Sequence, residues 1–228
     1  MMRATLGIDL GLSGARAAVL REDMELIGRG RCAVPTREAH ALEADPKSWL
    51  EAAIGAARAA LADAEVASVD AIAIGALGPC PVLLDEKLEP VGPAPLFGID
   101  ARSEAHRQRL QRDLHLSDEA MSLDHTAPKL LWLRDTQPKR FARARWVVDA
   151  AGYIVAALTG VPTIDRATAS YHLAPRLKPI LPLPEPHEAQ DIAGGLLPGM
   201  AQRLGLPAGI PVAIGGCDSY VDFTAIGM

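Results

Sequence analysis

The sequence predicts an α/β fold with a mixed central sheet, and two observations support this prediction. Three short, largely apolar segments (residues 4–10, 14–21 and 24–31) follow one another with tight connections, which is typical of an antiparallel meander. A predicted helix then leads into a nearly continuous apolar run over residues 68–75, the pattern of a strand buried on both faces. Three strands, a crossover helix and a buried strand together predict one sheet with strands of both directions.

The crossover helix follows Asp45-Pro46. An Asp side chain can cap the free N–H groups of a first turn, and Pro suits the first helical position. Apolar residues then recur at the spacing of an amphipathic helix: Trp49, Leu50, Ala53, Ile54, Ala57 and Leu61. We therefore expect a helix that packs one face against the sheet.

The rest of the chain alternates helices, short strands and loops. We expect helices over 102–115, 128–134, 138–144 and 149–158, short strands over 82–85 and 146–148, and a proline-rich extended loop over 172–186. An apolar strand over 209–215 is followed by a turn at 216–218 and by the start of a helix at Ser219.

The composition indicates a globular protein and excludes several partners. Hydrophobic residues make up 49% of the chain and charged residues 22%, enough for a full core. The formal net charge of −5 gives no reason to expect nucleic acid or an anionic membrane as partner. The three cysteines lack zinc-ligand spacing, and no apolar run is long enough for a membrane span. We expect a cytoplasmic protein with reduced thiols.

The first candidate site is the turn between the first two predicted strands. Asp9 leaves the end of an apolar strand, and Gly11, Ser13, Gly14 and Arg16 follow it. A carboxylate, backbone N–H groups freed by glycine, a hydroxyl and a cation are what a metal-bound polyphosphate needs. The alternative interpretation is a β-hairpin whose turn is merely polar and rich in glycine.

Later stretches add further candidates. The loop 75–81 follows the buried strand, and loops at the carboxyl ends of such strands commonly contact ligands. Asp218 is delivered by a second apolar strand, much as Asp9 is by the first. It could act as a general base or simply cap the helix that follows. Asp100 and Arg102 offer an acceptor and a donor at a strand-to-helix junction, or a cap and a solvated cation.

Four stretches in this order resemble the FGGY carbohydrate kinases. The first is Gly-Ile-Asp-Leu-Gly at 7–11, and the second is the Asp-x-Arg segment at 96–102. The third runs from Pro-Lys-Leu-Leu-Trp-Leu at 128–133 through Leu-Thr-Gly at 158–160 to Asp-Arg-Ala-Thr-Ala-Ser at 165–170, and the fourth is 209–218. The resemblance implies an actin-like ATPase or ribonuclease H-like fold. It also implies that residues 1–228 form the N-terminal, sugar-binding domain, with the C-terminal nucleotide-binding domain absent from this chain.

The family resemblance also implies an activity. It is ATP-dependent, xylulokinase-like phosphorylation of a pentulose or related polyol, with ATP and Mg²⁺ as cofactors. The implied partners are a small sugar or polyol, a covalently linked C-terminal kinase domain and a second copy in a homodimer. We expect this chain alone to be inactive. The alternative is a non-catalytic actin-like module for sugar binding or assembly.

The resemblance assigns roles residue by residue. Asp218 is the implied general base and also contacts substrate, and Asp9 holds Mg²⁺, through a metal-bound water. Residues of the first turn contact ATP phosphates, and a second group contacts the sugar. The phosphate group comprises Gly11, Ser13, Gly14 and Arg16, and the sugar group comprises Leu77, Gly78, Asp100 and Arg102.

Three departures from the family pattern affect these roles. Leu12 stands where a Thr is common, so Ser13 must supply the hydroxyl. The loop at 75–79 reads Gly-Ala-Leu-Gly-Pro where many xylulose-type members have Gly-Gln-Met-His-Gly, so its contacts to sugar must come from the backbone. Gly98 and Ile99 replace a common Trp-Asn pair, which removes an aromatic platform.

Overall fold

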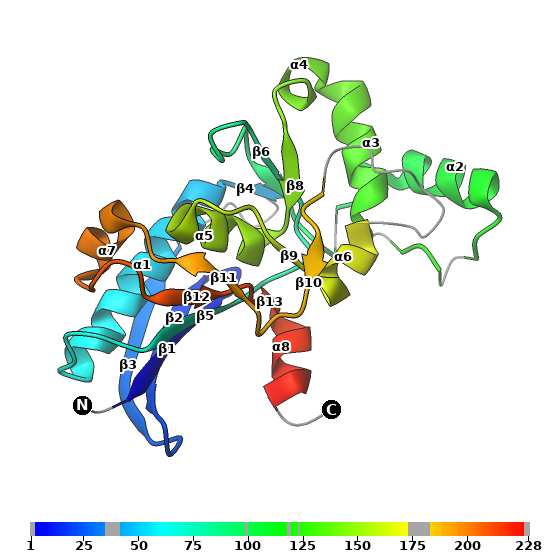
Figure 1. Cartoon of the computed structure of the whole chain (residues 1–228). Helices are drawn as coiled ribbons and strands as arrows, with labels where there is room; N and C mark the ends of the chain where they lie inside the picture. Colours follow the sequence, from blue (N-terminus) through cyan, green and yellow to red (C-terminus); the bar gives the residue numbers. More distant parts are fainter. Residues whose placement is uncertain are drawn as a thin grey trace.

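A seven-stranded mixed sheet forms the centre of the protein in the computed structural model, which describes residues 3–34, 42–98, 100–117, 120–122, 124–172 and 183–225. Six strands run in the order β11-β12-β5-β1-β2-β3, and β13 also pairs with β5 (Figure 1). Their bounds are β1 Ala4–Leu10, β2 Gly14–Arg21, β3 Leu26–Ala33, β5 Ala71–Ala76, β11 Ile192–Gly195, β12 Pro211–Ala213 and β13 Gly216–Cys217.

The strand directions confirm the predicted mixed sheet. Strands β1, β2 and β3 form an antiparallel meander, whereas β5 pairs parallel to β1 and to both β12 and β13. β11 returns antiparallel at the edge. The third strand begins at Leu26 rather than at the predicted residue 24, because Met24 adopts a positive φ of 68° in the connecting turn.

Helix α1 (Pro46–Asp63) provides the predicted crossover and packs closely on the sheet. Asp45 caps it as expected, since its side chain accepts a hydrogen bond from the backbone N–H of Lys47 at 3.0 Å. The close approach depends on glycine in β3: a Cβ at Gly30 would lie 2.0 Å from the carbonyl oxygen of Ala56. The helix backbone therefore occupies the space that a side chain on β3 would need.

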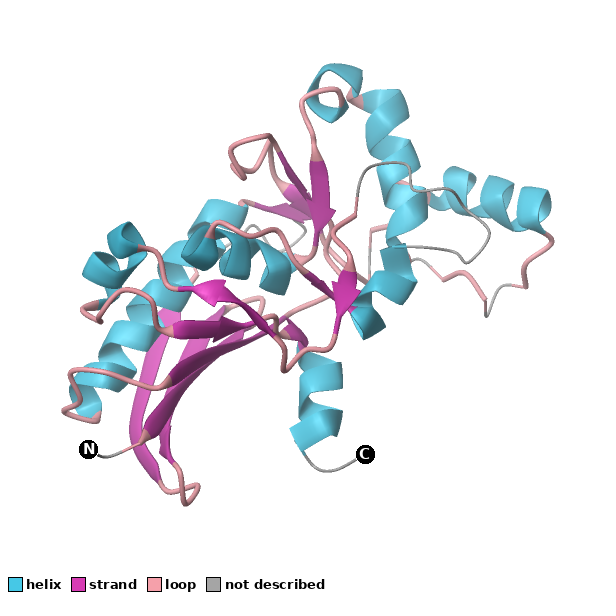
Figure 2. Cartoon of the chain, in the orientation of Figure 1, coloured by secondary structure: helices cyan, strands magenta, loops and turns pink. Residues whose placement is uncertain are grey.

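Helices cover the two faces of the sheet unequally. Helices α1, α5 (Ala150–Thr159) and α7 (Pro198–Leu204) pack on one face and share the main hydrophobic core with β1, β2 and β5. Helix α8 (Asp218–Ala225) leaves on the other side of the sheet (Figure 2). A Cβ at Gly75 would lie 4.0 Å from the side chain of Val221, so α8 approaches β5 over this second face.

The prediction that the segment 68–75 is buried on both faces is wrong. Within β5, the side chains of Ile72 and Ile74 are buried, but Ala73 between them is exposed. Only small residues face outward, and a run of Ala and Gly among isoleucines has the same apolar sequence pattern as a fully buried strand. The exposed face of β5 instead forms the floor of a cleft.

The last predicted strand, 209–215, is shorter in the structure, and a second short strand follows it. β12 ends at Ala213, and Gly215 turns the chain with a φ of +65° before β13 begins. A Cβ at Gly215 would lie 2.0 Å from the carbonyl oxygen of Ile74, so this sharp turn against β5 requires glycine. Residues 216–217 are therefore a short strand rather than the predicted turn.

A second group of elements extends away from the sheet, at the upper right of Figure 1. It holds two smaller hydrophobic clusters built mainly from α3 and its neighbours. Its helices are α2 Glu104–Leu114, α3 Thr126–Thr136, α4 Pro138–Phe141 and α6 Arg166–His172. Its short strands are β4 Glu43–Ala44, β6 Val82–Leu84, β7 Ala94–Pro95, β8 Trp146–Val148, β9 Ile164–Asp165 and β10 Pro186–His187.

The predicted helices are present with bounds shifted by one to three residues. Helix α3 begins at Thr126, before Pro128, and α4 ends at Phe141 rather than at 144. Helices α6 and α7 and the strands β4, β7, β9, β10 and β11 were not predicted. Residues 173–182 of the predicted proline-rich loop lie outside the described residues. None of the helices in the described ranges combines the length and hydropathy needed to cross a membrane.

Candidate active site

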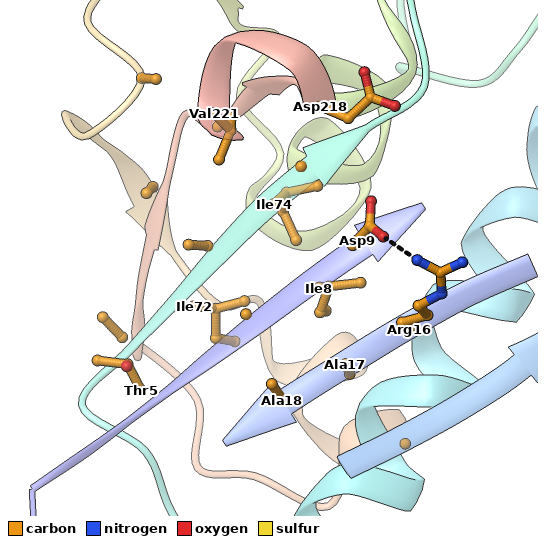
Figure 3. A pocket seen from close by; sticks show the side chains of 18 of the residues that line it. Thr5, Ile8, Asp9, Arg16, Ala17, Ala18, Ile72, Ile74, Asp218 and Val221 are labelled. Atoms are coloured by element: carbon orange, nitrogen blue, oxygen red, sulfur yellow. Dashed lines mark ion pairs between the residues drawn. The ribbon is translucent and has the colours of Figure 1, made fainter. Parts of the chain in front are cut away.

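The cleft on the open face of the sheet brings the two candidate carboxylates together. It has a volume of about 890 Å³, and its lining includes Asp9, Arg16, Gly75 and Asp218 (Figure 3). Asp9 enters from the end of β1, Arg16 from β2 beside it, and Asp218 from the first residue of α8. Most of the remaining lining comes from residues of β1, β2, β3 and β5, which include Arg29 and Arg31 of β3.

Strand pairing fixes where Asp9 and Asp218 lie. Asp9 is the partner of Gly75 in the β1–β5 pair, and Gly216 is the partner of the same Gly75 in the β13–β5 pair. Asp218 follows Gly216 by two residues. The carboxyl ends of three parallel strands thus deliver both acids to one edge of the sheet, where open α/β sheets commonly bind ligands.

Asp9 and Arg16 form an exposed ion pair at the mouth of the cleft. An Nη1 atom of Arg16 lies 3.7 Å from Oδ2 of Asp9, and the two side chains are 71% and 50% exposed. Such a loose, solvated pair contributes little to stability. Both groups therefore remain accessible to a ligand.

The turn between β1 and β2 lies beside the cleft, but its other predicted residues do not line it. The backbone N–H of Gly11 donates to the carbonyl of Gly14 at 2.9 Å, which closes a tight turn. Gly14 packs against the backbone of Cys32, where a Cβ would lie 2.6 Å from the carbonyl oxygen. Leu12 and Ser13 are exposed at the tip. Contact of Gly11, Ser13 and Gly14 with phosphate stays a prediction.

One carboxylate oxygen of Asp218 accepts hydrogen bonds from the two neighbouring residues. Its Oδ1 accepts hydrogen bonds from the backbone N–H of Ser219 at 2.7 Å and from the Cys217 thiol at 3.4 Å. Among the described residues, the hydrogen bonds to this carboxylate all go to Oδ1. Oδ2 accepts no hydrogen bond from this part of the chain.

The neighbouring Cys217 is not suited to nucleophilic chemistry. The residue is buried, and burial is the main reason that its pKa is raised to about 11. The thiol is therefore protonated at neutral pH, whereas a reactive cysteine needs the thiolate.

The predicted sugar-side residues Asp100 and Arg102 form a second group. Arg102 donates from Nε to Oδ1 of Asp100 at 2.9 Å and from Nη2 to Oδ2 at 2.8 Å, a two-pronged pair. Burial alone would raise the pKa of Asp100, but the hydrogen bonds and charge of Arg102 outweigh it and lower the pKa. Neither residue is among the described residues that line the cleft. Direct sugar contact by Asp100, which is buried and bound at both oxygens, stays a prediction.

Three further residues hold this pair and the segment before it: Glu43, which the sequence did not single out, and Lys129 and Trp132 of the 128–133 motif. Nη2 of Arg102 also donates to Glu43 at 3.2 Å, and its guanidinium lies 4.3 Å from the ring centroid of Trp132. The buried Lys129 donates from Nζ to the carbonyl of Leu96 at 2.8 Å. Lys129 lies one helical turn before Trp132 on α3, so both side chains are on the same face of that helix and contact the 96–102 segment. This i, i+3 spacing is the sequence feature that could have indicated their shared role.

The loop after β5 contributes through its backbone. The Leu77 side chain is buried, and its backbone N–H donates to the carbonyl of Leu10 at 2.7 Å. Gly78 lies next to Cys217, since a Cβ there would be 3.5 Å from the sulfur. Any contact of this loop with substrate must therefore come from carbonyl or N–H groups near Asp218, as the sequence predicted.

Comparison with known proteins places this architecture in one family. Residues 4–177 match the N-terminal domain of the FGGY family of carbohydrate kinases. The chain is 28% identical over 243 residues to xylulose kinase from Escherichia coli K12, a match that covers 98% of this chain and 50% of the relative. The chain thus spans about half the length of the curated relatives it matches.

Solved structures agree in fold. Xylulose kinase from Rhodospirillum rubrum superposes with a TM-score of 0.83 at 22% identity, covering 99% of this chain and 51% of that one. Gluconate kinase from Lactobacillus acidophilus gives 0.82 at 16% identity, covering 97% and 49%. The actin-like ATPase fold expected from the sequence is confirmed. The chain belongs to the FGGY family of carbohydrate kinases.

Proposed function

We propose that this chain is the N-terminal domain of a two-domain, ATP-dependent kinase that phosphorylates a hydroxyl group of a pentulose or related polyol. The observation that supports it best is the placement of Asp9 and Asp218 in one cleft, on strands that flank β5. The half-length coverage of the relatives supports a second domain.

In this proposal, Asp218 acts as the general base. Its Oδ2 accepts the proton of the attacking sugar hydroxyl while that oxygen forms a bond to the γ-phosphorus and the bond to the β-phosphate oxygen breaks. The hydrogen bonds to Oδ1 hold the carboxylate at the start of α8 during the transfer. ADP is the leaving group.

Asp9 is proposed to hold the metal. Mg²⁺ is usually bound by one or two carboxylates together with waters and substrate phosphates, and the described residues contain no cluster of three or more candidate ligands. A single half-exposed carboxylate at the mouth of the cleft fits this mode, with its contact made through water. When bound, Mg²⁺ would neutralise negative charge on the phosphate oxygens. Arg16 supplies a cation next to it.

The proposal is tested on the full-length gene product and on the 228-residue chain. The longer protein should release ADP in the presence of one member of a panel of pentuloses, hexuloses, aldonates and polyols, and not without it. Sugar binding with no ADP release would favour the alternative of a non-catalytic sugar-binding module. The 228-residue chain should show negligible turnover, because the proposed second domain completes the nucleotide site. Robust phosphorylation by this chain alone would contradict the two-domain account.

A further inference from the structure

A cluster of buried polar side chains lies next to strand β13. Its members are less than 8% exposed, and each has a side-chain oxygen without a hydrogen-bond partner among the described residues. They are Asp149, Thr163, Asp165 and Thr168. Buried polar atoms without partners are uncommon in folded proteins, so this concentration requires an explanation.

Each carboxylate in the cluster uses one oxygen to cap a helix. Oδ1 of Asp149 accepts from the backbone N–H of Gly152 at 2.7 Å, at the start of α5. Oδ1 of Asp165 accepts from the backbone N–H of Thr168 at 2.9 Å, at the start of α6. In both residues Oδ2 is the atom without a partner.

Close backbone contacts bring the elements of the cluster together. A Cβ at Gly152 would lie 2.4 Å from the carbonyl oxygen of Thr163 and 3.1 Å from Oδ1 of Asp149, so the first turn of α5 packs on the segment leading into β9. A Cβ at Gly216 would lie 3.0 Å from both Cγ and Oδ2 of Asp165. The free oxygen of Asp165 therefore lies against the backbone of β13, two residues before Asp218.

None of the ion pairs among the described residues includes either carboxylate, and the adjacent Arg166 pairs instead with Glu188 at 2.9 Å. Among the described residues, Asp165 and the Cys80 thiol are titratable neighbours of Asp149, and neither supplies a positive charge. Burying two carboxylates in the ionised form would cost several kcal/mol, on the order of the penalty for an unpaired buried ion.

We propose that the Asp149 carboxyl holds a buried proton next to Asp165, and that Asp165 positions Gly216 and, through it, Asp218. A protonated Asp149 carboxyl is neutral and has an O–H that can donate, whereas its ionised form would place a bare Oδ2 without a partner in the interior. The positioning half rests on the proposed role of Asp218, whereas the proton-holding half does not.

The charge environment gives the direction of the pH effect. Burial, and then the charge of Asp165, raises the pKa of Asp149 to about 7. An Asp in the unfolded chain has a pKa of about 3.9. The folded state therefore binds the proton more tightly, and its contribution to stability is complete below about pH 4 and is lost as the pH rises through about 7.

Thermal unfolding of the chain between pH 5.0 and 8.5 tests the proton-holding half. The parent Tm should fall toward the alkaline end, whereas Asp149→Asn should remove that fall, since an amide keeps the cap and the donor but does not ionise. At pH 8.5 we expect the variant to unfold roughly 5 °C above the parent. Asp45→Asn is the matched control, an exposed cap on α1 that should keep the parent's pH dependence.

If the Tm of Asp149→Asn falls with pH as much as the Tm of the parent does, the proposal that Asp149 holds a proton is overturned. If Asp149→Asn does not fold, the carboxyl ¹³C resonances of the parent provide the second measurement. One Asp carboxyl should titrate with a midpoint well above pH 5.5, and the absence of any such titration would equally overturn this half.

Kinetics of the full-length protein test the positioning half. Asp165→Ala removes the oxygen that lies against Gly216, so kcat should fall about tenfold or more while the KM for sugar stays within about twofold. Asp165→Asn, which keeps the shape of the side chain, should restore most of kcat. An unchanged kcat in Asp165→Ala would overturn the positioning role. A protein without kinase activity would overturn the proposed function but leave the unfolding result as evidence on the proton.

Discussion

Asp9 and Gly216 lie on opposite sides of the same residue, since each is the strand partner of Gly75 in β5. Neighbouring strands are about 4.8 Å apart, so the two backbones are held roughly 10 Å apart across one strand. Gly216 is the first residue of the two-residue strand β13, and Asp218 is the residue directly after that strand. Strand pairing therefore sets the separation of the Asp9 and Asp218 backbones, and the position of the cleft that both residues line follows from the sheet.

Asp9→Asn in the full-length protein should raise the Mg²⁺ concentration needed for half-maximal turnover by about tenfold or more, because a water-mediated contact acts as an outer-shell ligand. Affinity for sugar should change little. Titrating ADP release with Mg²⁺ measures the first effect, and calorimetry measures the second. Glu22→Gln, in the exposed turn after β2, is the control. An unchanged Mg²⁺ requirement would remove Asp9 from the metal site.

Arg102→Lys should destabilise the chain by about 1–2 kcal/mol, because Lys cannot bind both oxygens of Asp100 and stacks poorly on Trp132. Urea unfolding measures the change. Arg109→Lys is the control, since Arg109 is exposed and its Nε lies 3.7 Å from Asp113 in a loose pair. Equal stability of the two variants would show that the forked pair contributes nothing beyond a surface charge.

Gly30→Ala should destabilise the chain by about 2 kcal/mol or more, because its Cβ would press on the backbone of α1. Gly199→Ala is the matched comparison: nothing lies within 4 Å of a Cβ there, and in helix α7 alanine is favoured by about 0.5–1 kcal/mol. The two urea midpoints should therefore move in opposite directions. A tolerated Gly30→Ala would mean that α1 does not approach β3 this closely.

The sequence was sufficient where local signals and tertiary packing agree. The cap at Asp45, the Pro at the start of α1 and the meander of β1 to β3 each have a local signature, and all were predicted. The exposed face of β5 was not, because the alternation of Ile72 and Ile74 with alanine carries no polar residue to mark the open side. An apolar run does not show by itself which face another part of the protein covers.

The candidate site can be divided in the same way, into residues with a local sequence signature and contacts that depend on the tertiary fold. Asp9 and Asp218 could be singled out because each comes where an apolar strand ends, and Arg16 because it follows the turn after Asp9. The fold brings all three to one cleft. The support of Arg102 by Glu43 could not, since 59 residues separate the pair in the chain. The carboxyl pair of Asp149 and Asp165 was equally hidden, because each Asp reads locally as an ordinary helix cap.

The central claim is that Asp218 is the base, and Asp218→Asn in the full-length protein tests it most directly. The amide keeps the size of the side chain and the hydrogen bond from Ser219 but cannot take a proton. We predict that sugar-dependent ADP release is lost, by about a hundredfold or more, while sugar binding is largely retained. Asp45→Asn, the cap on α1, should leave turnover unchanged. Turnover by Asp218→Asn at the parent rate would contradict the account.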